Sequence, residues 1–346
     1  MARRPPTKDK RDFNPSQISA SRVNAYLSCG QAFEMKYIQN LPEQVSGSAA
    51  LFGLVIHHAL ERWAINRKHD LVTLMSQAWL AETEGTSVND FIGAYQAIAV
   101  EVLRAEKTAA EEFLSRNGRE TKAVRMTASF KKSKAFAKEQ KLLAEWLPRL
   151  EKDSPWRFTE RDPLPALYNE SLVLAKKYAA RWANLPDAWV TEFGFDVKFH
   201  DFILNGYIDS IEPLVNADGE IEAMLVVDYK TYAKEPAEQK DWRQVVMYDV
   251  AVRQLIEREA LLLPVDDLPI LVCLDYPRLL ERKYWRITEK DHDRLATELR
   301  MYRAGVSNGV FLPAEKGRNP DFCPYPENCC LRTKGEGCAI PVEVAQ

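Results

Sequence analysis

The stretch Val226-Val227-Asp228-Tyr229-Lys230-Thr231 decides the fold of this chain. It ends an apolar run that begins at Met224, and it places a carboxylate and an amine one residue apart. Residues i and i+2 of a strand project from the same face, so Asp228 and Lys230 are expected side by side. A bare Asp-x-Lys also occurs by chance as a surface ion pair, so its meaning depends on the surrounding sequence.

A second strand-like run upstream, Asn205-Gly206-Tyr207-Ile208-Asp209-Ser210, also ends in an acid. We expect the two runs to be adjacent antiparallel strands whose ends bring Asp209 and Asp228 to one cavity. Carboxylates, joined by the backbone carbonyl of Tyr229, are suited to hold Mg²⁺ or Mn²⁺. Such an ion offsets the charge of a phosphodiester transition state. The Lys230 amine can orient or deprotonate the attacking water, or stabilise the developing anion.

Apolar periodicity predicts the elements around these two runs. We expect strands at 189–199, 203–211, 221–232, 270–276 and 283–287, and helices at 242–256 and 289–304. Asn216-Ala217-Asp218-Gly219 predicts a hairpin turn, and Thr288 predicts a helix cap. The resulting order, β-β-β-α-β-β with flanking helices, predicts an α/β fold.

Two helical segments precede this region. One begins after a cap at Ser19 or Ser21, contains Cys29 and breaks near Gly30. The other, 51–63, carries the adjacent pair His57 and His58. Neighbouring side chains on a helix diverge by about 100°, so at most one of the two histidines faces a given site.

Residues 71–186 are almost entirely helical in pattern, with one break marked by prolines 155, 163 and 165. Residues 116–141 contain nine basic residues and two acids. A solvated helical face is the usual meaning of such a run, and contact with a phosphate backbone is the alternative. Both interpretations remain open. The basic residues are Arg116, Arg119, Lys122, Arg125, Lys131, Lys132, Lys134, Lys138 and Lys141.

The totals exclude several classes of protein. The formal net charge is −3, so any nucleic-acid contact must come from a local patch. No apolar run approaches the roughly 20 residues that span a bilayer. Residues 1–15 are basic and expected to be disordered, without the apolar segment of a secretory signal. We therefore expect a cytoplasmic protein.

Four of the six cysteines crowd near the end of the chain: Cys323, Cys329, Cys330 and Cys338. In a reducing compartment such a cluster favours metal binding over disulfides. Cys273, within an apolar strand, is expected in the core.

The motifs together resemble the PD-(D/E)XK nuclease superfamily, and more narrowly its RecB-like and Cas4-like exonuclease branch with an iron–sulfur cluster. The resemblance covers roughly 16–63 and 189–340. It rests on Ser19-x-Ser21-Arg22 … Cys29, Gly53-x-x-x-His57-x-x-Leu60-Glu61, Gly206-x-Ile208-Asp209, Asp228-x-Lys230 and Gln244-x-x-x-Tyr248.

The resemblance implies a restriction-endonuclease-like core, a central mixed sheet flanked by helices, with a large helical insertion. It implies His57, Asp209 and Asp228 as ligands of Mg²⁺ or Mn²⁺, and Lys230 as the catalytic lysine. Gln244 and Tyr248 would line the site and hold substrate or order Lys230.

The resemblance also implies a [4Fe–4S] cluster held by one early and three late cysteines. These would be Cys29, Cys323, one of Cys329 and Cys330, and Cys338. The spacing is wider than the family's usual pattern, so Zn²⁺ is the alternative cofactor.

The implied organisation has five parts. They are a tail at 1–15, the helical beginning of the nuclease domain at 16–69, a helical insertion at 70–186 that could bind DNA, the nuclease core at 187–308 and a cysteine-rich region at 309–346.

The implied activity is that of a metal-dependent DNA exonuclease in the recombination, repair or replication of a phage or mobile element. Its substrate would be linear ends or single strands of DNA, in the cytoplasm of a bacterium or a phage-infected host cell. Recombination or replication proteins are its possible partners, and self-association is left open. The alternatives are a Cas4-type nuclease of CRISPR adaptation and a non-catalytic iron–sulfur DNA-binding module of a repair complex.

Overall fold

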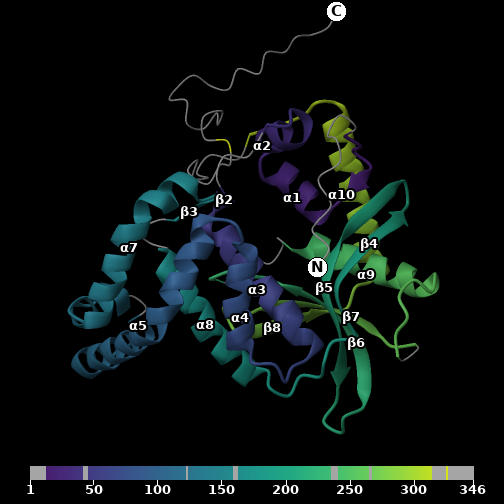
Figure 1. Ribbon diagram of the computed structural model, residues 1–346. Coiled ribbons are helices and arrows are strands. Elements are labelled where there is room, and N and C mark those ends of the chain that lie inside the picture. Colours follow the sequence, from purple (N-terminus) through teal and green to yellow (C-terminus); the bar gives the residue numbers. More distant parts are fainter. Residues whose placement is uncertain are drawn as a thin grey trace, which may run out of the picture. The chain divides into compact units, whose positions relative to one another are not determined.

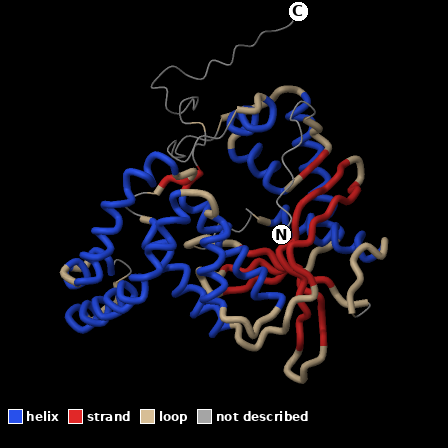
Figure 2. The backbone as a smooth tube through the Cα atoms, in the orientation of Figure 1, coloured by secondary structure: helices blue, strands red, loops and turns tan. Residues whose placement is uncertain are grey.

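The computed structural model describes residues 13–41, 46–121, 124–158, 163–234, 241–264, 267–313 and Tyr325. The chain divides into two compact units. Unit 1 comprises residues 1–44 and 186–346, and unit 2 comprises residues 45–185. Figure 2 distinguishes the strands, which gather in unit 1, from the helices that dominate unit 2.

Unit 1 is built on a six-stranded mixed sheet in the order β1-β5-β6-β7-β8, with β4 also paired to β5. β4, β5 and β6 form antiparallel pairs, β6 and β7 are parallel, and β8 returns antiparallel to β7. The strands are β1 (Gln17–Ile18), β4 (Val190–Phe199), β5 (Phe202–Val215), β6 (Ile221–Tyr229), β7 (Ile270–Tyr276) and β8 (Glu281–Trp285).

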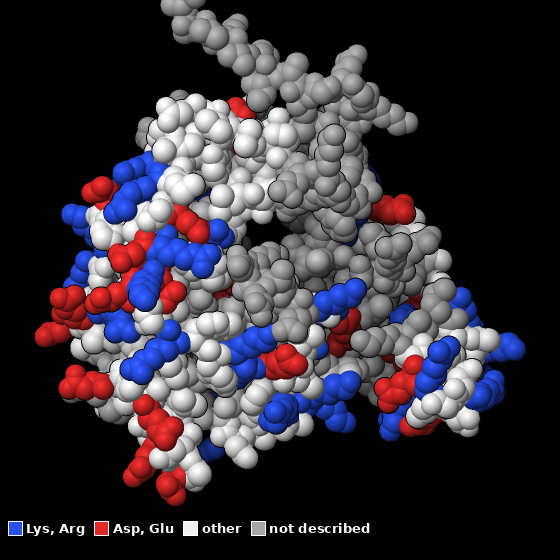
Figure 3. Space-filling model, turned by 180° about the vertical axis from the view of Figure 1, so that it is seen from behind, with Lys and Arg blue, Asp and Glu red and all other residues white. Residues whose placement is uncertain are grey.

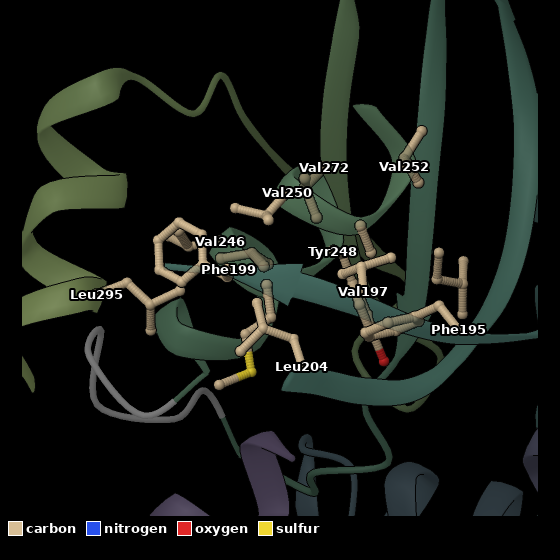
Figure 4. Packing of buried hydrophobic residues seen from close by; sticks show 14 of the residues in the cluster. Phe195, Val197, Phe199, Leu204, Val246, Tyr248, Val250, Val252, Val272 and Leu295 are labelled. Carbon is tan, nitrogen blue, oxygen red and sulfur yellow. The ribbon is translucent and has the colours of Figure 1, made fainter. Parts of the chain in front are cut away.

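Helix α9 (Trp242–Glu257) is the crossover between the parallel strands β6 and β7, and it packs on the sheet (Figure 1). Its buried face meets alternate side chains of β4, where Phe195, Val197 and Phe199 point inward. Phe195 meets Tyr248 of α9 edge to face, with ring centroids 5.9 Å apart. Figure 4 shows these aromatic and branched side chains interleaved, so the core holds α9 at a fixed position beside the strand ends.

The remaining helices of unit 1 pack around α9. Helix α10 contacts both α9 and α1, and α1 is capped by the Ser19 side chain. Helix α10 begins at the cap predicted at Thr288, which forms a capping box with Asp291. These helices are α1 (Ala20–Ser28), α2 (Gly30–Phe33), which continues as a π-helical turn at Glu34–Ile38, and α10 (Glu289–Ser307).

Unit 2 is a helical assembly with a two-stranded parallel ribbon of β2 and β3. Helix α3 packs on α4 and α8, and the long helix α5 packs on α7. The elements are β2 (Ser46–Gly47), α3 (Ser48–Ile65), α4 (Leu71–Glu82), α5 (Ser87–Asn117), α6 (Ala128–Lys131), α7 (Lys134–Asp153), β3 (Trp156–Arg157) and α8 (Leu164–Arg181), with a 3₁₀ turn at Val124–Met126.

The expected α/β fold with a helix-flanked mixed sheet is confirmed, and each predicted strand and helix of unit 1 is present. One detail differs. Asp209 lies in the middle of β5 rather than at a strand end, because β5 is long enough to pair with two neighbouring strands. β4 pairs with Phe202–Ile211 and β6 with Ser210–Val215, so Asp209 stands where the pairing to β6 stops.

The expected division of the chain into a nuclease domain and an insertion at 70–186 stays a prediction. Helix α3 lies in unit 2, because its apolar residues pack against α4 and α8.

Candidate active site

The site of interest lies at the carboxyl end of β6. Ser210 and Val227 form the last pair of the β5–β6 ladder, and Asp209 and Asp228 are the next residues beyond it. Asp209 Oδ2 accepts a hydrogen bond from the backbone N–H of Tyr229 at 2.7 Å. The two aspartates are thus brought together, and the carboxylate of the first is tied to the backbone beside the second.

Lys230 completes this pair. Its Nζ lies 2.6 Å from Asp228 Oδ2 and donates to Gln244 Oε1 at 2.7 Å. Burial by itself would lower the pKa of the Lys230 ammonium. The negative charges of Asp228, Asp241 and Asp209 outweigh burial, so the pKa lies above its ordinary value. The lysine is held as a cation among acids.

Gln244 and Tyr248, one turn apart on α9, complete the network. Gln244 Nε2 donates to Asp228 Oδ1 at 2.7 Å and lies 2.6 Å from the Tyr248 hydroxyl. That hydroxyl lies 3.0 Å from Asp228 Oδ1 and 2.8 Å from the Tyr207 carbonyl oxygen. Burial, together with the charges of Asp228 and Asp209, raises the Tyr248 pKa well above its ordinary value, so the phenol stays protonated. One glutamine therefore orients both the lysine and its carboxylate.

Asp241 is an acid that the sequence reasoning missed. It is 5% exposed, precedes α9, and accepts from the Tyr232 hydroxyl at Oδ1. Its Oδ2 has no hydrogen-bond partner among the described residues. The signal available in the sequence was weak, because an aspartate before a helix usually indicates no more than a cap.

A buried ion cluster on neighbouring strands supports the same end of the sheet. Arg282 of β8 donates to Asp275 at 2.7 Å and to Glu212 at 2.9 Å, and Ser210 donates to Glu212. All of these side chains are almost fully buried. The carbonyl of Asp275 also accepts the Lys230 N–H at 2.7 Å, which fixes the backbone that carries the lysine.

The two adjacent histidines of α3 have different surroundings. His58 Nδ1 lies 2.7 Å from Glu82 Oε1 of α4, a contact within unit 2. His57 stands one turn before Glu61, so both project from one face of α3. His57 belongs to unit 2 and the aspartates to unit 1, and its role as a ligand remains a prediction from its motif.

Two of the six cysteines lie within the described residues. Cys273 is buried in β7, where burial raises the pKa of its thiol well above the ordinary value, as suits a core residue. Cys29 is half-buried at the start of α2. Cys323, Cys329, Cys330 and Cys338 lie outside the described residues.

Several cations of the basic run are paired within unit 2. Arg125 bonds Glu106 and Glu139, Lys138 bonds Glu101 at 2.7 Å, and Arg116 lies 3.8 Å from Glu112. Those acids come from α5 and α7 and reduce the local excess of positive charge. On the face drawn in Figure 3, basic and acidic side chains are interspersed. DNA contact by this run stays a prediction.

The residues at the end of β6 suit a divalent cation. Their donors are carboxylate and carbonyl oxygens, which Mg²⁺ and Mn²⁺ prefer. Three acids, Asp209, Asp228 and Asp241, act on the single ammonium of Lys230, so negative charge is in excess. An Asp-x-Lys strand end and a facing aspartate on a helix-flanked mixed sheet define a nuclease of restriction-endonuclease-like fold.

The family follows from a direct comparison. Residues 17–330 match the model of the PD-(D/E)XK nuclease superfamily, and the chain belongs to that superfamily. Its members are nucleases that use divalent metal ions, with DNA as the substrate that the family implies. Among curated proteins, none matches the chain. Across the described residues, each helix is too short or too polar to cross a membrane.

Proposed function

We propose that this protein is a Mg²⁺- or Mn²⁺-dependent DNA exonuclease of the RecB-like and Cas4-like branch. The observation that carries the proposal is the hydrogen-bonded network of Asp228, Lys230, Gln244 and Tyr248 beside Asp209. A module that only bound DNA would have no need to hold a lysine between acids in this way. The non-catalytic alternative is therefore disfavoured.

Each residue has a proposed task. Asp209, Asp228 and the Tyr229 carbonyl would hold the metal ion, with His57 joining them on the strength of its motif. The bound ion supplies positive charge that offsets the charge of the phosphodiester transition state. Lys230 orients the attacking water or donates to the developing anion through Nζ. Gln244 accepts from Lys230 and donates to Asp228, so it sets the direction of both groups.

We further propose linear ends or single strands of DNA as substrate, in recombination, repair or replication of a phage or mobile element. A Cas4-type role in CRISPR adaptation is the enzymatic alternative. Degradation of end-labelled linear DNA beside a closed circle separates exonuclease from endonuclease action, since a circle has no ends.

The decisive variant is Asp228→Asn, which keeps the shape of the side chain and removes its charge. We expect metal-dependent degradation of DNA to fall by at least about a hundredfold, because metal charge stabilisation is worth several kcal/mol. Asp218→Ala, in the exposed hairpin between β5 and β6, is the control and should retain activity. Full activity of Asp228→Asn, with its fold intact by circular dichroism, would contradict the assignment.

We also propose a [4Fe–4S] cluster held by Cys29, Cys323, one of Cys329 and Cys330, and Cys338. Two contacts support it. Tyr325, between the first two late cysteines, donates to the Leu41 carbonyl at 3.2 Å. The backbone at Phe311 and Leu312 passes so close to Gly30 that a Cβ there would lie 2.7 Å from an atom of Leu312. Phe311, Leu312 and Tyr325 thus lie against residues 30–41, the segment that follows Cys29.

Anaerobic purification tests the cluster. We expect brown protein with visible absorption, which Cys29→Ser should lose and Cys273→Ala should retain, since Cys273 is a core residue. Colourless protein with stoichiometric zinc would establish the alternative cofactor instead.

A further inference from the structure

Tyr207 is an exposed aromatic residue two positions before Asp209. Of the large apolar side chains that the structure describes as exposed, two are aromatic, Tyr207 at 52% and Tyr284 at 46%. An exposed tyrosine ring leaves its apolar face in water, where it is available for stacking on a ligand. Tyr207 has no function in the network described above beyond its backbone carbonyl, which lies 2.8 Å from the Tyr248 hydroxyl.

The surroundings of the ring give it a fixed position. Tyr207 pairs with Gly194 of β4, and a Cβ on that glycine would lie 3.1 Å from the Tyr207 ring. The next rung has the reverse arrangement, in which Phe195 pairs with Gly206 and a Cβ on Gly206 would lie 2.9 Å from the Phe195 ring. The phenylalanine points inward and packs on Tyr248. The Tyr207 ring packs over Gly194 in the same way, on the outer face of the strand pair.

The backbone of Tyr207 adjoins the proposed metal ligands. Its carbonyl oxygen lies 2.8 Å from the Tyr248 hydroxyl, which lies 3.0 Å from Asp228 Oδ1, and Asp209 is two residues further along β5. Two residues along a strand span about 7 Å, so a nucleotide bound at Asp209 can also contact Tyr207. On β4, the exposed acids Glu192 and Asp196 stand two residues to either side of Gly194, the partner of Tyr207. They would repel phosphate from this part of the strand. A nucleobase is therefore the part of DNA that this ring can contact.

We propose that Tyr207 is a stacking platform for a nucleobase next to the scissile phosphate, and that this contact favours single-stranded or frayed DNA. The inference rests on the proposed nuclease function. A base must leave the duplex before its flat face can lie on a side chain, so the site selects unpaired ends. Stacking accepts all four bases, which suits a nuclease without sequence preference.

Binding and turnover of DNA test the proposal separately. Fluorescence anisotropy in EDTA measures the affinity for a labelled single-stranded oligonucleotide under conditions where metal-dependent cleavage cannot occur. We expect Tyr207→Ala to weaken binding and raise KM roughly tenfold, with kcat little changed, because one stacked base contributes on that scale. Tyr207→Phe and Tyr207→Trp should stay near the wild type. Tyr284→Ala is the matched control and should have no effect.

An abasic substrate identifies the partner of the ring. Removing the base from each terminal nucleotide in turn should weaken binding by the wild type at one position, and Tyr207→Ala should be insensitive at that position. Equal losses in both proteins, or a Tyr207→Ala variant with a lower Tm and unchanged DNA affinity, would overturn the proposal and leave the ring as a cover for Gly194. Because binding is measured without cleavage, an inactive wild type would count against the nuclease function alone.

Discussion

Each unit of the molecule contains a polar cluster made of the same kinds of side chain. In unit 1, Lys230 lies among carboxylates with the amide of Gln244 and the hydroxyl of Tyr248. In unit 2, Arg125 lies between Glu106 and Glu139, whose carboxylate also accepts from Tyr95, and Asn169 donates to Tyr95. A cation, acids, a phenol and an amide are common to both.

The clusters differ in their charge balance. Arg125 bonds each of its two acids directly, and Glu139 is fully buried. Burial by itself would lower the pKa of Arg125, but Glu139 and Glu106 outweigh it and raise that pKa. At Lys230 three acids act on one ammonium. Both clusters contain more carboxylates than cations, but in unit 2, the closed cluster, the cation bonds both of its acids directly, whereas the larger excess of carboxylate in unit 1, the open cluster, is available to a divalent ion.

The choice of cation follows the same division. Arginine remains charged under all ordinary conditions and presents several donors in a fixed plane, which suits a permanent link between α5 and α7. Lysine is a compact charge on a flexible stem and can exchange partners. Similar residues thus form a structural link in unit 2 and the proposed active site in unit 1, where one more acid acts on the cation.

Removing the cation from the closed cluster should have the largest effect on stability. Arg125→Met leaves Glu139 buried without its partner, and we expect a loss of about 3–5 kcal/mol in the free energy of unfolding. Lys138→Met, which breaks the exposed pair with Glu101, is the control and should cost no more than about 1 kcal/mol. Denaturant unfolding measures both. Equal small losses would mean that the unit 2 cluster is not closed.

Removing the cation from the open cluster should have a smaller effect that metal reverses. Lys230→Met should abolish cleavage, and its loss of stability should be recovered when Mn²⁺ binds the freed carboxylates. At a hundred times the dissociation constant, binding would contribute about 2.7 kcal/mol. Thermal unfolding with and without Mn²⁺ measures this recovery, using Arg125→Met as a variant that metal should not rescue. Rescue of both variants, or of neither, would remove the distinction between the clusters.

Much of the fold was predictable because it depends on local pattern. Alternating apolar residues predicted β4, and the run before Asp228 predicted β6, within a few residues of their observed ends. The cap residue Thr288 predicted where α10 begins. The site was predictable in part, since Asp-x-Lys and Gln-x-x-x-Tyr are short motifs carried by a strand and a helix.

The remainder depended on contacts between distant residues. Nothing local in the sequence marks Asp241 as a neighbour of Lys230, and nothing marks Glu101, Glu106 and Glu112 as partners of the basic run. Strand register decided that Asp209 lies in mid-strand and bonds the Tyr229 backbone. The position of the Tyr207 ring against Gly194 likewise needed the pairing of β4 with β5.

The sequence by itself determined the element order and the α/β class, and it indicated the residues that we propose bind a metal ion and cleave a phosphodiester. Periodicity and short motifs carry that information, because each depends on neighbours along the chain. Only the tertiary structure decided which charges meet. Burial and register bring acids to a cation from separate elements, and the electrostatic balance that separates a structural link from a reactive site exists only once those elements have packed.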